Sequence, residues 1–460
     1  MQQTLDITKK QKTTYAVPLW LRDLQIRQAI ERVKGRIEGP LEARPDPIAI
    51  VCYGPSLADT WERVRNFQYI FTGSGSHKFL IEKGLDPATF SGWYHAEVDP
   101  RPHKVDLMGP PHSAVEYLIA STCHAKLFDH LQGFNLRLWH IFDTAEEGLR
   151  ILPRNEWALT GGQNVGLRQL TLAAFLGFRD LHIFGMDGSE AKTGKHAGPH
   201  PMQAKKSAAV EYEGVTYYST PAFAECARQT FLELDQLGPT ITATFYGEGL
   251  VQHMARNYVR KPVENALVFF NKPEVISAEY AALNAQLHEE NLFYGVGGDK
   301  HVERILKMAE AIQKEKKELF PPLSILDYGC GKGFLAKALP FPIWEYDPAI
   351  PGKEEPPRPA EFCICTDVLE HIEPDKLPIV LDDLRRCTRL VGFFSVHTGA
   401  AQKTLPDGRN AHLIQQDAEW WTKQISAYFN ITKIIAAQPE VYFIVHPKPG
   451  KMTANAAGIQ

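Results

Sequence analysis

The chain is 460 residues long, with 44% apolar residues, 23% charged residues and a net charge of −4. This length exceeds one typical domain, so we expect two or three domains in a globular protein. The small net charge gives no overall attraction to nucleic acid or to an anionic membrane, although a local basic groove keeps a nucleic-acid substrate open. No apolar run approaches the roughly 18 residues of a membrane span.

The cysteines indicate a reducing compartment. All seven are scattered without a paired framework, and several lie in apolar strand-like runs such as 50–52 and 362–365. Reduced, buried thiols are typical of cytosolic proteins. Residues 1–14 also lack the apolar core of a signal peptide. We therefore expect a cytoplasmic protein, and a homo-oligomer is compatible with the sequence.

The first domain is predicted over residues 45–255, after an N-terminal helical extension over 1–44. Strand-like runs occur at 48–53, 68–73, 93–99, 117–121, 136–142, 181–187 and 241–247. Helical patterns lie between them at 58–66, 124–131, 165–176 and 222–237. Strands interleaved with helices indicate βαβ units and a mostly parallel sheet that is covered on both faces.

Turn residues and polar groups follow these strands. The first turn would expose the Ser56 hydroxyl and the following amides at the start of a helix, which suits a phosphate group. In chain order the candidate binding and catalytic residues are Gly54, Pro55, Ser56, Asp99, Gly161, Gly162, Asp187, His196 and His200.

This ordered set resembles the MptE-like family of 6-hydroxymethylpterin diphosphokinase domains. The same domain occurs in flagellin-associated motility accessory factors and is similar to bacterial CMP-sialic-acid sialyltransferases. The resemblance implies a nucleotide donor, either a nucleotide-sugar or ATP, bound by the Gly-Pro-Ser turn and by Gly161–Gly162. It also implies that His196 or His200 is the base on an acceptor hydroxyl, with Asp99 and Asp187 near the phosphates or a Mg²⁺ ion.

A second domain is predicted over residues 275–448. Helical stretches at 275–290 and 298–317 lead into a buried strand that ends at Asp327. A glycine turn then opens a helix, where the backbone can approach a ligand closely and offers unpaired N–H groups. Its three glycines are Gly329, Gly331 and Gly333.

Two further strands of this domain also end in acidic residues. The first ends at Asp347, and we expect this carboxylate to accept both hydroxyls of a ribose, with Glu345 as the alternative. The second strand is followed by Asp367 and His371. For His371, a general-base role and a solvated position on a helix are equally compatible with the sequence.

A long polar loop follows the strand predicted at 391–397. Open α/β folds bind ligands beyond the ends of their strands, so this loop supplies candidates for binding the acceptor. The alternative is a solvated hairpin tip at Asp407–Gly408. The candidates are Asp407, Arg409 and Asn410 for binding and His412 for catalysis.

The Asp-x-Gly-x-Gly-x-Gly spacing and the run Asp-Val-Leu-Glu-His-Ile resemble the class I S-adenosylmethionine (SAM) methyltransferases. The resemblance implies SAM as cofactor, with Asp327 facing its methionine end and Asp367 also at the cofactor. One departure is clear, because only about 15 proline-rich residues separate Asp347 from Phe362. We therefore predict a shortened class I fold that lacks one β-α unit.

The expected fold class is α/β, with two Rossmann-like domains that each hold a mostly parallel sheet flanked by helices. The expected function is that of a bifunctional transferase. One domain would transfer a glycosyl or diphosphate group, and the other would methylate a small molecule, a glycan or a modified nucleotide. The alternative is a nucleotide- and SAM-binding scaffold with one or both domains catalytically degenerate. The first strand is not followed by a GxGxxG turn, which disfavours a Rossmann oxidoreductase. The sequence defines no metal site.

Overall fold

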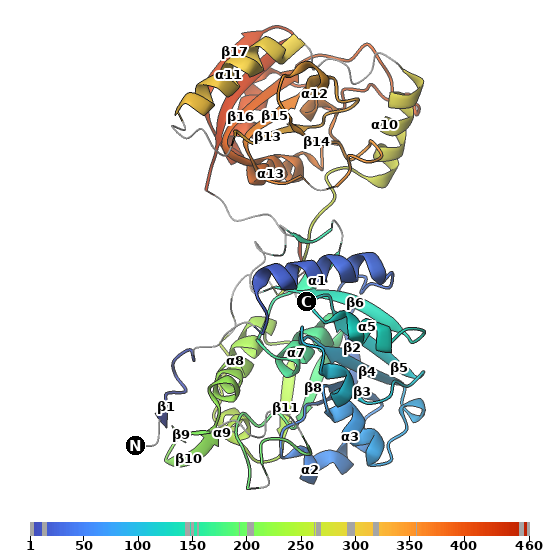
Figure 1. Cartoon of the computed structure of the whole chain (residues 1–460), viewed down its shortest axis with the longest axis vertical. Helices are drawn as coiled ribbons and strands as arrows, with labels where there is room; N and C mark the ends of the chain where they lie inside the picture. The colour runs from blue at the N-terminus through green and yellow to red at the C-terminus, as the bar shows by residue number, and fades with distance from the viewer. Residues whose placement is uncertain are drawn as a thin grey trace. The chain divides into compact units, whose positions relative to one another are not determined.

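The computed structural model describes residues 4–11, 16–142, 148, 151–153, 156–192, 194–199, 207–261, 263, 268–291, 300–315, 322–355, 357–449 and 455–457. It divides into two compact units, one of residues 1–272 with 454–460 and one of residues 273–453 (Figure 1). Both units are α/β, with a mostly parallel sheet flanked by helices. None of the helices in the described ranges combines the length and the apolar character that crossing a bilayer would need.

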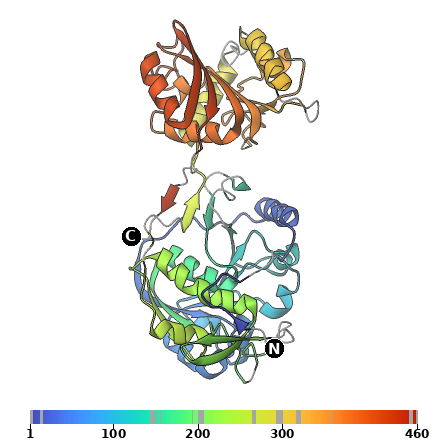
Figure 2. The same cartoon turned by 90° about the vertical axis from the view of Figure 1, so that its left-hand side faces the viewer.

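The first unit is built on a ten-stranded sheet. From edge to edge its strands are β11 (Thr242–Tyr246), β8 (Phe178–Phe184), β2 (Arg44–Val51), β3 (Tyr69–Gly73), β4 (Gly92–Glu97), β5 (Val115–Ala120), β6 (Leu136–Ile141), β7 (Trp157–Leu159), β12 (Phe269–Asn271) and β19 (Asn455–Ala457). All neighbours from β11 to β7 are parallel, and β12 and β19 pair antiparallel. Figure 2 shows β19, in red, beside β12.

The order in which strands are added to this sheet reverses at β2. Strand β3 lies on one side of β2 and β8 on the other. Residues 48–51 of β2 are fully buried, as expected for a central parallel strand covered on both faces. Open α/β folds bind ligands where the strand order reverses, so the carboxyl end of β2 is the expected ligand position.

Helices cover both faces of this sheet, and a small second sheet completes the unit. The helices are α1 (Leu19–Arg32), α2 (Leu57–Thr60), η1 (Trp61–Asn66), α3 (Ser76–Glu82), η2 (Pro87–Thr89), α4 (Lys104–Met108), α5 (Ala125–His130), α7 (Val165–Phe175), α8 (Pro221–Leu237) and α9 (Leu250–Arg256). The small sheet consists of β1 (Thr4–Leu5), β9 (Ala208–Tyr212) and β10 (Val215–Ser219). Since β1 pairs with β9 and α1 buries Ile26 and Ala29, residues before β2 take part in the unit rather than extend from it.

The second unit is built on a six-stranded sheet. Its elements are α10 (Ala278–Glu290), α11 (Val302–Glu315), β13 (Ile325–Tyr328), α12 (Phe334–Ala338), β14 (Trp344–Tyr346), β15 (Ala360–Thr366), η5 (Leu369–His371), α13 (Leu377–Cys387), β16 (Thr388–His397), α14 (Ala418–Tyr428), β17 (Phe429–Ala437) and β18 (Glu440–Pro447). The strand order is β14-β13-β15-β16-β18-β17, and only β18 runs against its neighbours.

Alternating residues of β15 build a core on each face of this sheet. Cys363 and Cys365 belong to the cluster that also holds apolar residues of α13 and α14. Phe362 and Ile364 belong to the opposite cluster with residues of α11 and α12. A strand buried on both faces has to be apolar throughout, which explains the unbroken run that we read from the sequence.

The predicted loss of one β-α unit is confirmed. In the described residues between β14 and β15 the chain forms turns and extended segments but no helix or strand. Among the described residues, β14 pairs with β13 alone and is an edge of the sheet.

Candidate active sites

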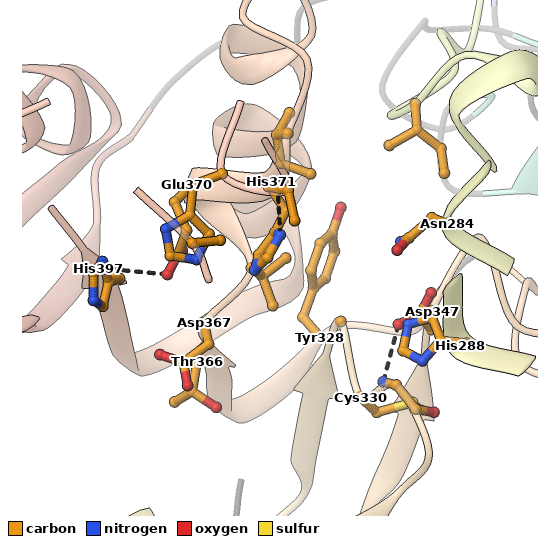
Figure 3. A pocket seen from close by; sticks show the side chains of 18 of the residues that line it. Asn284, His288, Tyr328, Cys330, Asp347, Thr366, Asp367, Glu370, His371 and His397 are labelled. Atoms are coloured by element: carbon orange, nitrogen blue, oxygen red, sulfur yellow. Dashed lines mark hydrogen bonds between the residues drawn. The ribbon is translucent and has the colours of Figure 1, made fainter. Parts of the chain in front are cut away.

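The second unit holds a cavity of about 440 Å³ at the carboxyl ends of its parallel strands (Figure 3). Residues that follow β13, β14, β15 and β16 line one side of it, and α10 supplies another wall. Of the residues predicted for this domain, the cavity is lined by Asp327, Gly329, Gly331, Asp347, Asp367, His371 and His412.

The glycine turn after β13 needs its glycines for conformation. Gly329, Gly331 and Gly333 have φ values of 79°, 48° and 71°, in the left-handed region that favours glycine. A Cβ atom on Gly329 would lie 2.4 Å from Val368 Cγ2. Gly333 begins α12 and packs against Glu345 rather than lining the cavity.

Two buried carboxylates face this cavity. Burial raises the pKa of Asp327 to about 7, and the negative charges of Glu345 and Asp347 add to the rise. Burial also raises the pKa of Asp347, which accepts hydrogen bonds from the Gly331 and Ala349 N–H groups at 2.9 and 3.0 Å. A buried carboxylate with a raised pKa is stabilised by a cation, so Asp327 fits the ammonium group of a SAM molecule.

A cluster of Glu370, His371 and His412 lies elsewhere in the same cavity. Burial raises the pKa of Glu370 to about 8, with a contribution from Asp367. Burial lowers the pKa of His371 to about 3, with a contribution from His412. His371 Nδ1 lies 2.8 Å from the Ala411 carbonyl oxygen, and His412 Nδ1 lies 2.7 Å from that of Gly399. His371 therefore lines the cavity and is only partly exposed.

Asp367 adopts an uncommon backbone conformation for a residue other than glycine, with φ of 56°. Its carboxylate forms an ion pair with Lys300 at 2.8 Å and contacts Ser395 Oγ at 3.3 Å. Lys300 also lines the cavity, and the sequence analysis did not single it out.

Three predicted acceptor-binding residues do not line this cavity. Asp407 and Arg409 are bound to each other, with Arg409 Nε 2.7 Å from Asp407 Oδ2, on a tight turn closed by Gly408. Asn410 holds the loop by hydrogen bonds to the backbone of Ala401. The alternative reading of a hairpin tip is the one that the structure bears out, because the two opposite charges pair locally.

Helix α10 contributes three polar residues to the cavity that the sequence analysis missed. Tyr280, Asn284 and His288 line it, and they are spaced four residues apart. This spacing places them on one face of a helix, and it is the signal that could have identified them. Figure 3 shows Asn284 and His288 on the same side of the cavity as Asp347.

In the first unit, the predicted phosphate turn at Gly54–Pro55–Ser56 is filled by a carboxylate of the protein itself. Asp187 Oδ2 accepts the Ser56 N–H at 2.8 Å, and Asp187 Oδ1 accepts the Ser56 hydroxyl and the Gln252 side chain. A Cβ on Gly54 would lie 2.5 Å from Asp187 Oδ2. Burial raises the pKa of Asp187 to about 6. The Ser56 hydroxyl is therefore not presented to a phosphate as the sequence predicts, because Asp187 already binds it.

His196 lies beside this turn, and His200 lies outside the described residues. His196 Nδ1 is 3.3 Å from the Tyr53 carbonyl oxygen, and the two rings stack with centroids 5.8 Å apart. Burial lowers the pKa of His196 to about 4. The structure therefore brings His196 to the carboxyl end of β2.

A cluster of opposite charges lies after β3 and β4. Lys104 Nζ contacts Ser74 Oγ at 3.0 Å and lies 3.7 and 3.8 Å from the carboxylates of Glu97 and Asp99. Burial raises the pKa of Asp99, but the hydrogen bonds from Arg101 and the charge of Lys104 outweigh this effect and lower it. Asp99 is thus part of a charged cluster, and the sequence did not single out its lysine, Lys104.

The predicted Gly161–Gly162 segment packs closely on the protein. Gly161 has φ of 130°, and a Cβ there would lie 2.9 Å from Glu233 Oε2. A Cβ on Gly162 would lie 2.2 Å from Leu167. Burial raises the pKa of Glu233 to about 7. These glycines are needed for packing, whether or not they also approach a ligand.

Two family models match separate parts of the chain. A model described as 6-hydroxymethylpterin diphosphokinase MptE-like matches residues 25–193. A model described as methyltransferase domain matches residues 300–430. No curated protein matches the chain.

Solved structures show weak likeness. A MAf glycosyltransferase from Magnetospirillum magneticum AMB-1 is 15% identical over 67% of this chain, with a TM-score of 0.37, and the chain spans about half (52%) of its length. The 1,6-didemethyltoxoflavin-N1-methyltransferase of Burkholderia thailandensis is 14% identical over 41% of this chain and 98% of its own, with a TM-score of 0.27. Magnesium protoporphyrin IX methyltransferase from Synechocystis PCC 6803 is 16% identical over 32% of this chain and 83% of its own, with a TM-score of 0.23.

The assignment rests on the two family models, because these structural likenesses are too low to carry it. The two family models match residues in different compact units of the structure. The chain therefore combines an MptE-like domain in its N-terminal half with a methyltransferase domain in its C-terminal half.

Proposed function

We propose that the second unit transfers a methyl group from SAM to an acceptor in its cavity. The observation that carries this proposal is that Asp327 and Asp347, at the ends of neighbouring strands, line one cavity together with Gly329 and Gly331. SAM supplies the methyl group when bound. Asp327 would pair with its ammonium group, Asp347 would accept hydrogen bonds from its ribose, and the glycine turn would let the backbone approach it.

The acceptor belongs on the side of Glu370, His371 and His412. The cavity volume of about 440 Å³ is at the small end of the range for ligand sites, so beside SAM there would be room for only the reacting part of an acceptor. We therefore propose that a small molecule, or one exposed group of a glycan or modified nucleotide, is methylated. None of the seven cysteines forms a disulfide, which supports the proposed cytoplasmic location.

Calorimetric titration with SAM and with S-adenosylhomocysteine tests this proposal. We expect one site per chain and a loss of affinity of roughly tenfold or more in Asp327→Asn, because the variant cannot neutralise the bound ammonium. Native mass spectrometry of protein purified from cells should detect retained SAM or its demethylated product. Absence of binding heat and of any thermal shift would instead support the scaffold reading.

A second proposal concerns the first unit, where we place a nucleotide-dependent glycosyl or diphosphate transfer. It is supported by His196, which contacts Tyr53 at the carboxyl end of β2, and by Lys104, which lies at the carboxyl ends of β3 and β4. Lys104 would bind nucleotide phosphates, and the carboxylates of this cluster would bind a Mg²⁺ ion. Thermal shifts with CMP, UDP and ATP, with and without Mg²⁺, test the proposal. We expect a shift with at least one of them that Lys104→Ala reduces, and no shift with any would contradict it.

A further inference from the structure

The cavity of the methyltransferase domain contains three side chains with the donor atoms of a metal site. Glu370 and His371 lie on η5 after β15, and His412 lies in the loop after β16. One ligand atom from each lies within 4.8 Å of the other two. Ligand atoms about 2.1 Å from one tetrahedral ion lie about 3.4 Å apart, so the three side chains would have to approach one another by roughly 1 Å or more to bind it.

The hydrogen bonds of the two imidazoles to backbone carbonyl groups set their tautomers. A carbonyl oxygen can only accept, so Nδ1 of His371 donates to Ala411 and Nδ1 of His412 donates to Gly399. In each neutral ring the lone pair is then on Nε2. Metal-binding histidines are oriented in this way, because the outer hydrogen bond fixes both the tautomer and the ring.

Glu370 supplies an independent observation. Its side chain is fully buried, and its Oε1 accepts the backbone N–H of His397 at 2.8 Å. Its Oε2 has no hydrogen-bond partner among the described residues, although the side chain lines the cavity. An unsatisfied buried carboxylate oxygen is costly, and a bound cation would remove this cost. Figure 3 shows Glu370 between His371 and His397.

The neighbouring side chains of Asp367, Lys300 and His397 have other partners than the three proposed metal ligands. The carboxylate of Asp367 is bound to Lys300 at 2.8 Å, and Lys300 also binds Glu440. The ring of His397 lies beside that of His412, with centroids 4.8 Å apart, and its Nδ1 contacts the backbone of Gly399. The Asp367 carboxylate and the His397 Nδ1 atom are therefore already bound to groups other than the three ligands.

We infer that Glu370, His371 and His412 bind one divalent first-row metal ion, with Zn²⁺ as the best match for two imidazole nitrogens and one carboxylate oxygen. Three protein ligands leave at least one open position toward the cavity, as in catalytic rather than structural zinc sites.

The consequence for catalysis rests on the proposed function. An acceptor hydroxyl that takes the open position loses its proton to solvent more easily, because the ion stabilises the alkoxide. The oxygen then forms a bond to the methyl carbon while the sulfur–methyl bond breaks. S-adenosylhomocysteine leaves as a neutral thioether, and one proton is released per methyl group transferred.

The experiment uses the full chain without an affinity tag, stripped with a chelator and titrated with Zn²⁺ or Co²⁺. We expect one ion per chain in elemental analysis and calorimetry. Bound Co²⁺ should give weak visible absorption bands without the intense sulfur charge-transfer band that cysteine ligands would cause. His371→Ala and His412→Ala should each weaken binding by at least about tenfold. His446→Ala, a histidine on β18 outside the cavity, is the matched control and should bind normally.

Two results would overturn the inference. One is an absence of stoichiometric Zn²⁺ and Co²⁺ binding by the wild-type chain, which would mean that a proton satisfies Glu370 Oε2 instead. The other is unchanged binding in the double variant His371→Ala/His412→Ala. The wild-type titration keeps the test valid if a variant fails to fold. Metal is titrated without SAM, and SAM is titrated into metal-free protein, so this proposal and the proposed function can fail separately.

Discussion

The backbone N–H of Gly331 donates a 2.9 Å hydrogen bond to Asp347 Oδ2, which joins the glycine turn after β13 to the end of β14. The same carboxylate lines the cavity, whereas Glu345, two residues earlier, forms an ion pair with Lys353 and does not line it. The choice between the two acidic residues, which the sequence left open, thus has a structural basis.

We predict that Asp347→Ala weakens SAM binding by roughly 10- to 100-fold, since hydrogen bonds to a charged group contribute about 1.5–3 kcal/mol. Glu345→Ala is the matched control and should change the dissociation constant by less than about threefold. Calorimetry on both variants measures the difference. A larger effect of Glu345→Ala would assign the ribose to that residue instead.

Asp327 should make SAM binding depend on pH. Its pKa in the free protein is about 7, raised by burial and then by Glu345 and Asp347, and opposed by Lys353. The bound ammonium favours the ionised carboxylate, so binding must expel a proton below pH 7. Affinity should fall roughly 20- to 30-fold from pH 7.5 to 5.5. Calorimetry at several pH values tests this, and Asp327→Asn should lack most of the dependence.

The same carboxyl should destabilise the unliganded domain. Its pKa is raised on folding, so the folded state binds more protons than the unfolded state between about pH 4 and 7. The free energy of unfolding therefore decreases as pH rises through this window, and the cost is complete above pH 7. Asp327→Asn should raise the melting temperature of this domain by several degrees at pH 8 and by less at pH 5. An equal effect at both pH values would contradict the assigned cause.

The sequence predicted the strands of both sheets well where burial makes a run uniformly apolar, as in β2 and β15. It missed the β9–β10 hairpin, because most of β10 is exposed, Val215 and Tyr218 included, and burial imposes no apolar pattern on it. Strand β1 could not be found either, because two residues gain their structure only by pairing with β9, which lies far away in the sequence.

The residues of the candidate site also divide into those that the sequence predicts and those that it does not. Asp327 and Asp347 lie at the carboxyl ends of two parallel strands, so their meeting at one edge of the sheet is a consequence of parallel topology that the sequence indicates. Tyr280, Asn284 and His288 required knowledge of where α10 packs, which local patterns do not contain. Asp187 was predicted as a functional residue, but its hydrogen bonds to Ser56 depend on the spatial neighbourhood of β2 and β8, 131 residues apart at these positions.

A stability effect is predicted for the turn after β2. Ser56 is buried and donates two hydrogen bonds to the Asp187 carboxylate, from its N–H and its hydroxyl. Ser56→Ala leaves that carboxylate short of one donor and should lower the free energy of unfolding of the first unit by about 1–3 kcal/mol. Ser91→Ala, which removes an exposed hydroxyl bound to Gln68, should cost less than about 0.5 kcal/mol. Urea unfolding followed by circular dichroism gives both values, and equal values would contradict the role of Asp187.

The last prediction concerns the attachment of α10, which forms a wall of the methyltransferase cavity. Its N-terminal residue Ser277 caps the helix through Tyr280 N–H at 3.0 Å, and Glu373 accepts both the N–H and the hydroxyl of Ser277 at 2.7 Å. Glu373 follows η5, which carries His371, so one carboxylate holds the start of α10 against the loop of the proposed metal ligands. Glu373→Ala should therefore loosen the helix and raise amide hydrogen exchange over 278–290.

Because Tyr280, Asn284 and His288 line the cavity, SAM affinity of the Glu373→Ala variant should fall by roughly threefold to tenfold as well. Glu279→Ala, an exposed acidic residue in the first turn of the same helix, controls for the loss of a negative charge near its N-terminus. Faster exchange with unchanged SAM affinity would show that α10 is not needed to bind SAM.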